Sequence, residues 1–557
     1  MDIRILTPRL SVGPQIALGD MAEIARQGYR AIICNRPDGE GADQPTFAEI
    51  ADAAKAEGLE ARYLPVQSGK VVDTDADAFD IALTELPGPI FAYCRTGIRS
   101  ATLWALSGAD RHEVPEILAA ARAAGYDMGG VVRRIANGGR TPTDTPDASF
   151  EVVIVGGGAA GIAVAASLRK RQPRAEIAII DPADIHYYQA GWTMVGGGVF
   201  DAAETVRTMG ALIPEDVRWI KAGVAAFEPE ADAVILEGCR VVRYERLIVC
   251  PGLKLDWNAV QGLVDTLGRN GVTSNYRYDL APYTWELVCG LDCGRAVFTQ
   301  PSMPIKCAGA PQKAMYLSGD AWQRRRVLDR IDIHFATAGP VLFGVKDYIP
   351  ALMEYVDRYG VSLDFHHDLV AVDGPAKVAT FEVKRPDAAL KTVEMPFDML
   401  HVCPPQTAPD FIRVSPLADA DGWVDVDQAT LRHKTFDNIW SLGDVMNAPN
   451  AKTAAAARVQ APVVAANVSA DMDDHAPIAQ YNGYGACPLT VERGKIVLAE
   501  FGYGGMLLPT LPKALIDGTR PSRAAWFLKE KILPPLYWQG MLKGREWMVH
   551  PETIEPD

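Results

Sequence analysis

The stretch Phe150-Glu-Val-Val-Ile-Val-Gly-Gly-Gly-Ala-Ala-Gly161 decides the fold of most of the chain. Its first six residues are apolar apart from Glu151, and they predict a buried strand. Gly156, Gly158 and Gly161 follow directly in a G-x-G-x-x-G pattern. Glycines at this spacing permit a tight turn and let the backbone approach a phosphate group closely.

The residues after this turn continue the same pattern. Residues 162–171 predict a helix, and residues 176–180 predict a second strand that ends at Asp181. The N-terminus of such a helix stabilises the charge of a pyrophosphate, and Asp181 can accept a hydrogen bond from a ribose hydroxyl. The order of strand, glycine turn, helix, strand and acid therefore predicts a Rossmann-like unit that binds a dinucleotide.

A second motif, far along the chain, favours FAD as that dinucleotide. Residues 435–444 predict a strand that ends in Gly443-Asp444, and this resembles the late motif of flavoproteins, in which the aspartate binds the ribityl chain. Taken alone, Gly-Asp is an ordinary turn, but paired with the first motif it favours FAD. Lys452 follows closely and is either a cation beside the flavin or a solvated surface lysine.

The place of a second glycine-rich turn is taken by a cysteine. Residues 296–300 predict the first strand of a second Rossmann-like unit, but Pro301-Ser-Met-Pro304 follows instead of a glycine pattern. Because proline offers no N–H to a phosphate, we expect no NAD(P)H site there. Cys307 comes next, with Lys306 beside it and Lys313 further on, and positive charges nearby lower the pKa of a thiol.

The other cysteines set limits on disulfides and metals. The chain has nine, an odd and sparse number for its length, so it is not a secreted disulfide framework. Cys289 and Cys293 lack a second Cys/His pair at ligand spacing, and we predict structural thiols and no metal site. Cys487 is a further redox candidate, but it lies 180 residues from Cys307, so sequence alone cannot place the two together.

Residues 1–136 predict a separate small α/β domain. Strand candidates at 31–34 and 89–93 alternate with Ala/Glu-rich helical stretches at 46–57 and 114–124. Residues 137–149 then form a polar segment rich in Gly, Pro and Thr, which is typical of a linker. We therefore expect a linker between the small domain and the dinucleotide unit.

One loop of the small domain carries thiol chemistry. In Tyr93-Cys-Arg-Thr-Gly-Ile-Arg-Ser100, the order strand, Cys loop and helix places Cys94 at a helix N-terminus, and Arg95 and Arg99 add positive charge. Four residues separate Cys94 from Arg99, whereas protein-tyrosine-phosphatase loops have five. The loop resembles the tighter one of rhodanese-type sulfurtransferases. The rest of the domain, including residues 35–40, resembles a phosphatase-fold family of sulfurtransferase or β-lactamase-hydrolase-like proteins. We favour sulfur transfer over phosphatase activity.

Composition and sequence patterns argue against several other classes of protein. The chain has 557 residues and a net charge of −15, which argues against a nucleic-acid binder. No apolar run reaches the roughly 18 residues needed for a spanning helix. The N-terminus lacks a basic region followed by an apolar one, so we expect no signal peptide and a cytoplasmic chain.

Six segments of the chain resemble sulfide:quinone oxidoreductases, especially the mitochondrial-type branch. These segments are 186–198, 305–318, 343–346, 422–426, 452–456 and 484–489. The resemblance covers about residues 150–550 and implies an α/β, FAD-dependent flavoprotein of the disulfide-reductase type with two Rossmann-like units. It further implies that Cys307 and Cys487 form the redox pair beside the flavin, that sulfide becomes a persulfide on Cys487, and that the electrons go to a quinone.

The end of the chain predicts contact with a membrane surface. Residues 521–557 interleave apolar and aromatic residues with lysines and arginines, which is typical of an interfacial anchor. The alternative is a packed pair of helices. With residues 150–520 as the flavoprotein module, we expect a cytoplasmic protein peripherally bound to the inner face of the membrane.

These patterns leave three functional hypotheses. The first is a bifunctional enzyme that oxidises sulfide with FAD and passes sulfane sulfur through Cys94 to a small acceptor such as sulfite, glutathione or a similar thiol. The second is a type II NAD(P)H:quinone dehydrogenase-like flavoprotein with a protein-phosphatase-like domain. The third is a redox-sensing binding module. The sulfur acceptor, the quinone species and formation of a homo-oligomer stay open.

Overall fold

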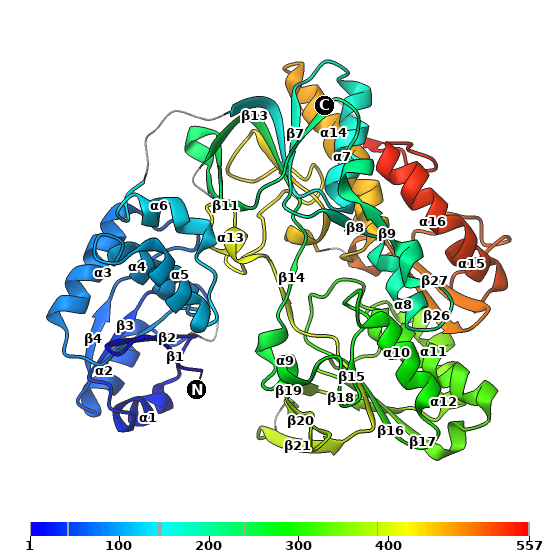
Figure 1. The fold of residues 1–557 in the computed structure, drawn as a ribbon, viewed down its shortest axis with the longest axis horizontal. Helices are drawn as coiled ribbons and strands as arrows, with labels where there is room; N and C mark the ends of the chain where they lie inside the picture. The colour runs from blue at the N-terminus through cyan, green and yellow to red at the C-terminus, as the bar shows by residue number, and fades with distance from the viewer. Residues whose placement is uncertain are drawn as a thin grey trace.

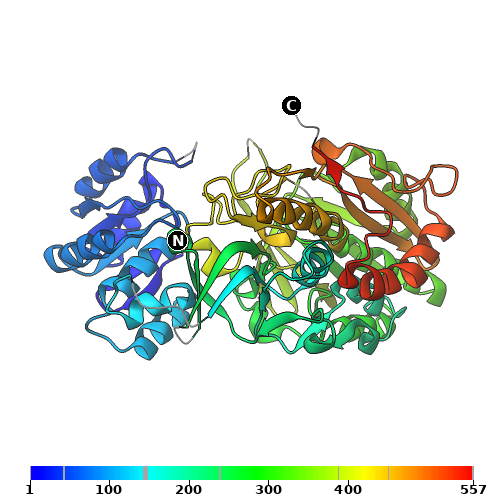
Figure 2. The ribbon, with the colours of Figure 1, turned by 90° about the horizontal axis from the view of Figure 1, so that it is seen from above.

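The computed structural model describes residues 2–41, 44–141, 148–237, 240–386, 388–449 and 451–554. Cys239 and residues 142–147 of the predicted linker lie outside this part of the chain. A small N-terminal α/β unit lies at one end of the long axis, beside a larger body that contains two further α/β units (Figures 1 and 2). This arrangement confirms the fold class predicted from the sequence.

The N-terminal unit is built around a five-stranded sheet of order β1-β2-β5-β3-β4. Every neighbouring pair is parallel except β1 and β2. The strands are β1 (Arg4–Thr7), β2 (Leu10–Gly13), β3 (Ala31–Cys34), β4 (Glu60–Tyr63) and β5 (Ile90–Tyr93). All side chains of β3 and β5 are buried, which explains their unbroken apolar sequences.

Helices cover both faces of this sheet. One face packs against α1 (Met21–Arg26) and α2 (Phe47–Ala56). The other packs against α3 (Asp73–Glu85), α4 (Ile98–Ser107), α5 (Val114–Ala123) and α6 (Val132–Ala136). The helix α4 begins just after the loop of Cys94, so the buried strand β5 and the buried helix α4 fix that loop from both sides.

The dinucleotide unit begins with β6 (Ala148–Val155). Its seven-stranded sheet has the order β10-β7-β6-β13-β12-β11, with β24 beside β13. The strands other than β6 are β7 (Ile177–Ile180), β10 (Val217–Ile220), β11 (Val224–Glu228), β12 (Ala233–Leu236), β13 (Val241–Val249) and β24 (Ile439–Ser441). The helices α7 (Ala159–Arg171) and α14 (Ala454–Met472) pack side by side on it (Figure 1). The strand expected over 435–444 is shorter than predicted, because Gly443–Val445 form a 3-10 turn.

The second α/β unit of the larger body has a five-stranded parallel sheet of order β15-β22-β16-β17-β18. Its strands are β15 (Val272–Thr273), β16 (Gly294–Gln300), β17 (Ile331–Thr337), β18 (Ser362–Phe365) and β22 (Met399–His401). The helix α11 (Ala310–Arg325) packs against the hairpin of β26 (Gly485–Glu492) and β27 (Lys495–Phe501). This packing brings two parts of the chain that are distant in sequence to one place.

The N-terminal unit contacts the larger body directly. The Ser68 hydroxyl donates to the Arg413 carbonyl at 3.4 Å, and Val414 packs against the core of the N-terminal unit. A Cβ on Gly69 would overlap the Ser415 carbonyl, so the two backbones meet closely there. The partition of the chain at residues 136 and 150 stays a prediction, because residues 142–147 lie outside the described part.

Candidate functional site

The glycines of the first motif form the tight turn that the sequence predicts. Gly156 has φ +106°, and a Cβ there would lie 2.5 Å from the Cys250 carbonyl oxygen. A Cβ on Gly161 would overlap the Gly156 carbonyl oxygen. Side chains at these two positions would therefore push the strand, the turn and the helix α7 apart.

The same turn fits a pyrophosphate. A Cβ on Gly158, at the N-terminus of α7, would meet nothing within 4 Å, and no side chain caps this end of the helix. Asp181 accepts from the Gly157 N–H at 2.6 Å and from the Ala183 N–H at 2.8 Å, and its carboxylate has lone pairs left for a ribose. An open, uncapped helix N-terminus beside a carboxylate suits the diphosphate and ribose of FAD.

The late motif lies against the same unit. The Gly443 N–H donates to the Gln460 side chain on α14 at 2.8 Å, and Asp444 lies beside Lys452. The Lys452 ammonium donates to the carbonyls of Asp444 and Met446 at 2.7 and 2.9 Å. Burial lowers the pKa of Lys452 to about 8, and the side chain is 6% exposed. The alternative of a solvated surface lysine is therefore wrong.

Cys307 and Cys487 meet at the packing of α11 on the β26–β27 hairpin. Their Sγ atoms lie 3.9 Å apart, although 180 residues separate them in the sequence. Cys307 precedes α11 with φ +48°, a left-handed conformation that is uncommon outside glycine, and its N–H donates to the Lys452 carbonyl at 2.8 Å. Gly309 leaves room for the pair, because a Cβ there would lie 2.5 Å from the Cys487 Sγ.

The two thiols are electrostatically unequal. A hydrogen bond from Cys487 lowers the pKa of Cys307 well below its ordinary value; burial opposes this shift, and the charge of Lys313 adds to it. The Lys313 ammonium lies 3.1 Å from the Cys307 Sγ. The same hydrogen bond, together with burial, raises the pKa of Cys487 well above its ordinary value. Cys307 is therefore the thiolate of the pair and Cys487 the thiol.

A lysine from the C-terminal segment completes this site, and sequence reasoning missed its role. Lys529 is 3% exposed, and its ammonium donates to the Ala190 carbonyl at 2.8 Å. Burial, reinforced by the charge of Lys313, lowers the pKa of Lys529 to about 7. It lies in a π-helical turn, Leu528–Ile532, and such turns occur frequently at functional sites. From the sequence, Lys529 was interpreted only as one of the basic residues of a membrane anchor.

The Cys94 loop is a second, separate thiol site. The Gly97 N–H donates to the Cys94 Sγ at 3.1 Å, and Gly97, with φ +88°, is the N-cap of α4. Cys94 is fully buried. The predicted position of a cysteine at a helix N-terminus is present, with the Gly97 N–H turned to the sulfur.

The two arginines of the loop point in different directions. Arg99 is buried beside Cys94, and its guanidinium binds both carboxylate oxygens of Glu40 at 2.8 and 2.7 Å. Arg95 instead reaches the larger body, where it donates to the Ala420 carbonyl at 2.7 Å and pairs with Asp421. Only Arg99 contributes its charge inside the loop, and its contact with Glu40 was not predicted.

The two thiol sites belong to different units of the molecule. The helix α4, which follows Cys94, belongs to the N-terminal unit, whereas β26, which carries Cys487, belongs to the larger body (Figure 1). The sequence could not decide whether sulfur passes directly between them. Among the described residues, the Cys94 sulfur contacts the Gly97 N–H, and the Cys487 sulfur contacts that of Cys307.

The C-terminal segment is more closely packed than an anchor requires. Trp526, Tyr537, Trp538, Met541 and Leu542 are buried. Phe527, Ile532, Trp547 and Met548 are exposed. The alternative of packed helices therefore describes most of this segment, while a few apolar side chains still face outward. No helix within the described ranges is long and apolar enough to cross a membrane.

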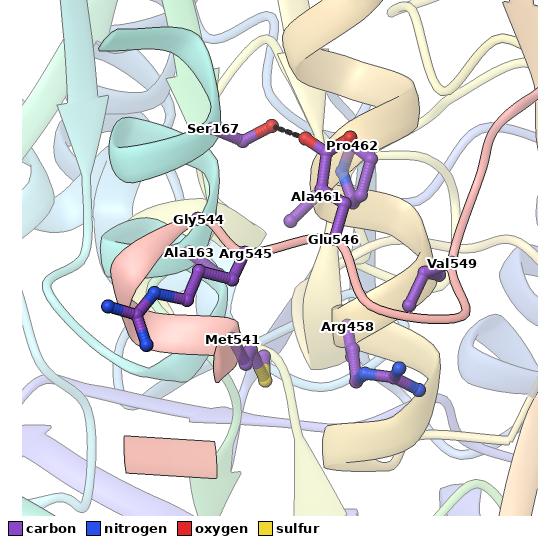
Figure 3. Close-up of a pocket in the computed structure, with 10 residues that line it drawn as sticks. All are labelled: Ala163, Ser167, Arg458, Ala461, Pro462, Met541, Gly544, Arg545, Glu546 and Val549. Atoms are coloured by element: carbon purple, nitrogen blue, oxygen red, sulfur yellow. Dashed lines mark hydrogen bonds between the residues drawn. The ribbon is translucent and has the colours of Figure 1, made fainter. Parts of the chain in front are cut away.

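The last turns of this segment close against the dinucleotide unit. Figure 3 shows a small pocket between α7, α14 and residues 541–549, with the Ser167 hydroxyl donating to the Glu546 carboxylate at 2.6 Å. Arg171 pairs with the same carboxylate, and Lys170 donates to the Gly544 carbonyl at 2.5 Å. Three residues of the helix that follows the glycine turn are thus fixed by the end of the chain.

Comparisons with known proteins support both parts of the chain. The family model "Beta-lactamase hydrolase-like protein, phosphatase-like domain" matches residues 2–111. The mitochondrial sulfide:quinone oxidoreductase of Dictyostelium discoideum is 40% identical over 398 residues, which cover 71% of this chain and 86% of that protein. The mouse mitochondrial protein of the same name is 37% identical over 395 residues, 71% of this chain and 87% of that one.

A solved structure agrees at the level of the fold. The crystal structure of the sulfide:quinone oxidoreductase from Aquifex aeolicus matches with a TM-score of 0.59 and 18% identity. The match covers 73% of this chain and 97% of that one.

Proposed function

The chain belongs to the sulfide:quinone oxidoreductase family, and from that premise we propose that Cys307 and Cys487 are the redox pair that oxidises sulfide. The observation that carries this proposal is the 3.9 Å separation of their Sγ atoms. Membership of the family implies FAD as the cofactor and sulfide and quinone as the substrates. The N-terminal phosphatase-like domain is an addition to this enzyme.

The first step follows from the unequal thiols. In the oxidised enzyme the two sulfurs are bridged, and a hydrosulfide ion attacks the sulfur of Cys487. The bond to Cys307 breaks, Cys307 leaves as a thiolate, and Cys487 holds the persulfide. The thiol with the lower pKa leaves more easily, and the hydrogen bond from Cys487 and the charge of Lys313 both lower the pKa of Cys307.

Residues of the dinucleotide unit would hold the cofactor. Gly156, Gly158 and Gly161 would cradle its pyrophosphate, Asp181 would bind a ribose, and Gly443-Asp444 would bind the ribityl chain. FAD, when bound, would supply the electron acceptor for the thiol pair and the electron donor for the quinone. Lys452, buried beside Asp444 and bonded through its carbonyl to the Cys307 N–H, links the thiol site to the late motif.

Cys94 is the sulfurtransferase nucleophile of the N-terminal domain. Its support is the Gly97 N–H at 3.1 Å and the neighbouring Arg99. Because the two thiol sites belong to different units, a small thiol such as glutathione carries the sulfur from Cys487 to Cys94 as an organic persulfide. Sulfite or a second thiol then takes the sulfur from Cys94.

The C-terminal segment, 521–557, associates with the inner face of the membrane, where quinone is dissolved. Its support is the exposed apolar set Phe527, Ile532, Trp547 and Met548 on an acidic chain. The same segment carries Lys529 into the redox site, on the π-helical turn that also holds the exposed Ile532.

Two matched variants test this division of labour. Cys307→Ser should abolish flavin reduction by sulfide, because the serine cannot form the bridge. Cys94→Ser should leave flavin reduction unchanged. The measurement is the bleaching of the flavin absorbance under anaerobic conditions after sulfide is added. Loss of bleaching in Cys94→Ser, or its retention in Cys307→Ser, would refute the proposal.

A further inference from the structure

Glu40 occupies the place in front of the arginine of the Cys94 loop. Its two carboxylate oxygens accept from the two terminal nitrogens of Arg99 at 2.8 and 2.7 Å. Arg36 donates to the same carboxylate at 2.8 Å, and Arg99 also donates to the Val66 carbonyl at 2.7 Å and interacts with the Cys94 thiol. The Glu40 side chain is 12% exposed, and those of Arg36 and Arg99 are 9% and 6% exposed. Both terminal nitrogens of Arg99 are therefore bound to Glu40.

A carboxylate in this position competes with any tetrahedral oxyanion. Arginine binds carboxylate and phosphate with the same planar pair of N–H groups. A phosphate at Cys94 would have to displace Glu40 or lie beside its charge, in surroundings where like charges repel strongly. Burial raises the pKa of Glu40, but the hydrogen bonds and charges of Arg99 and Arg36 outweigh it and lower the pKa, so the carboxylate stays ionised at neutral pH.

We propose that Glu40 sets the specificity of the Cys94 loop by excluding dianionic oxyanions, so that organic persulfides and not thiosulfate load Cys94 with sulfur. This rests on the proposed role of Cys94 as a sulfurtransferase nucleophile. Phosphate and thiosulfate are both tetrahedral dianions, and Glu40 rejects the two for the same reason. An organic persulfide carries a single charge at its reacting end and needs no oxyanion site.

The loading step conserves atoms and charge. The Cys94 thiolate attacks the outer sulfur of the organic persulfide, a bond forms between Cys94 and that sulfur, and the sulfur–sulfur bond of the donor breaks. The donor leaves as a thiolate, and Cys94 becomes a persulfide anion that faces the Gly97 N–H. No net oxidation takes place. With thiosulfate the same displacement would release sulfite, whose charge Arg99 would have to accept.

The first experiment measures anion binding without any sulfur chemistry. The full-length, FAD-containing protein is alkylated with iodoacetamide, and the rate at Cys94 is followed by peptide mass spectrometry at increasing inorganic phosphate. We expect phosphate to leave the alkylation rate of Cys94 in the wild type unchanged. In Glu40→Gln the terminal nitrogens of Arg99 are free, and phosphate should slow alkylation by about tenfold. Glu40→Asp keeps the charge and should resemble the wild type. The exposed Glu57 gives the matched control, Glu57→Gln.

The second experiment measures loading. The wild type and Glu40→Gln are incubated with glutathione persulfide or thiosulfate, and persulfide on Cys94 is measured by mass. Glutathione persulfide should load both proteins, whereas thiosulfate should load only Glu40→Gln. The proposal is overturned if phosphate protects Cys94 of the wild type from alkylation, or if thiosulfate loads Cys94 of the wild type with sulfur. It is also overturned if Glu40→Gln shows neither phosphate protection nor thiosulfate loading.

The outcomes for Glu40 and for Cys94 remain separate. If neither donor loads the wild type, the sulfurtransferase role of Cys94 fails, and phosphate protection alone then decides the role of Glu40. Loss of the N-terminal melting transition would show that Glu40→Gln does not fold. The two loading measurements on the wild type then decide. The proposal is overturned if thiosulfate loads Cys94 as fast as glutathione persulfide does.

Discussion

The Cys307–Cys487 pair and the Cys94 loop make a thiol reactive by different physical means. At the pair, a second thiol and the buried ammonium of Lys313 stabilise the thiolate of Cys307. At Cys94, the Gly97 N–H contacts the sulfur, and Glu40 takes up the fork of the neighbouring arginine. The pair brings two sulfurs to 3.9 Å from one another, whereas the loop holds a single cysteine. The chemistry of each site thus depends on the partners of its sulfur more than on the cysteine itself.

We expect the largest effect on activity from removing the charge of Lys313 beside the Cys307–Cys487 pair. In Lys313→Met, Cys307 loses the cation 3.1 Å from its sulfur, and we expect flavin reduction by sulfide to fall by about 100-fold, as for loss of a charged hydrogen bond at a reacting atom. Stopped-flow measurement of flavin bleaching checks this. Lys391, which is exposed, gives the matched control Lys391→Met. An unchanged rate in Lys313→Met would mean that the two sites are activated alike.

A smaller effect should appear in the pH dependence of thiol alkylation, and only at the Cys307–Cys487 pair. Burial lowers the pKa of Lys529 to about 7, so its ammonium is charged below pH 7 and neutral above it. The charged form favours the Cys307 thiolate. We therefore expect Lys529→Met to slow alkylation of Cys307 by about tenfold below pH 7 and by much less above pH 8. Alkylation of Cys94 across the same pH range serves as the internal reference, and a parallel change there would contradict the assignment.

The smallest effect concerns the contact between the units. Arg95 pairs with the exposed Asp421, and exposed ion pairs contribute at most about 1 kcal/mol. In Arg95→Ala we expect flavin reduction to stay unchanged and the melting temperature of the N-terminal unit to fall by a few degrees at most. Differential scanning calorimetry measures it. A drop in the rate of flavin reduction would show that the two sites are coupled through this contact.

Local patterns in the sequence predicted local structure well. The strand β6, its glycine turn and α7 are where the motif placed them, and so is the loop of Cys94 between β5 and α4, because each depends on neighbouring residues. The contact between Cys307 and Cys487 depends on a hairpin packed against α11, and no spacing in the sequence reveals it; only the family resemblance pointed to it.

The features that the sequence missed are contacts of single charged residues. Glu40 and Lys529 lie in segments without periodicity or a motif, and their partners come from distant elements. The C-terminal segment was harder for another reason. A helix that packs against a protein and one that lies on a membrane need the same mixture of aromatic, apolar and basic residues, so composition alone could not separate the two.

The contacts of Glu546 and Gly544 with α7 have a consequence for the order of synthesis. The N-terminal unit is contiguous in sequence and can fold while the rest of the chain is still on the ribosome. The helix behind the glycine turn, in contrast, contacts through Ser167 and Arg171 a carboxylate that lies 379 and 375 residues further along the chain. During synthesis the Cys94 loop can therefore fold long before the contacts that hold α7 can form.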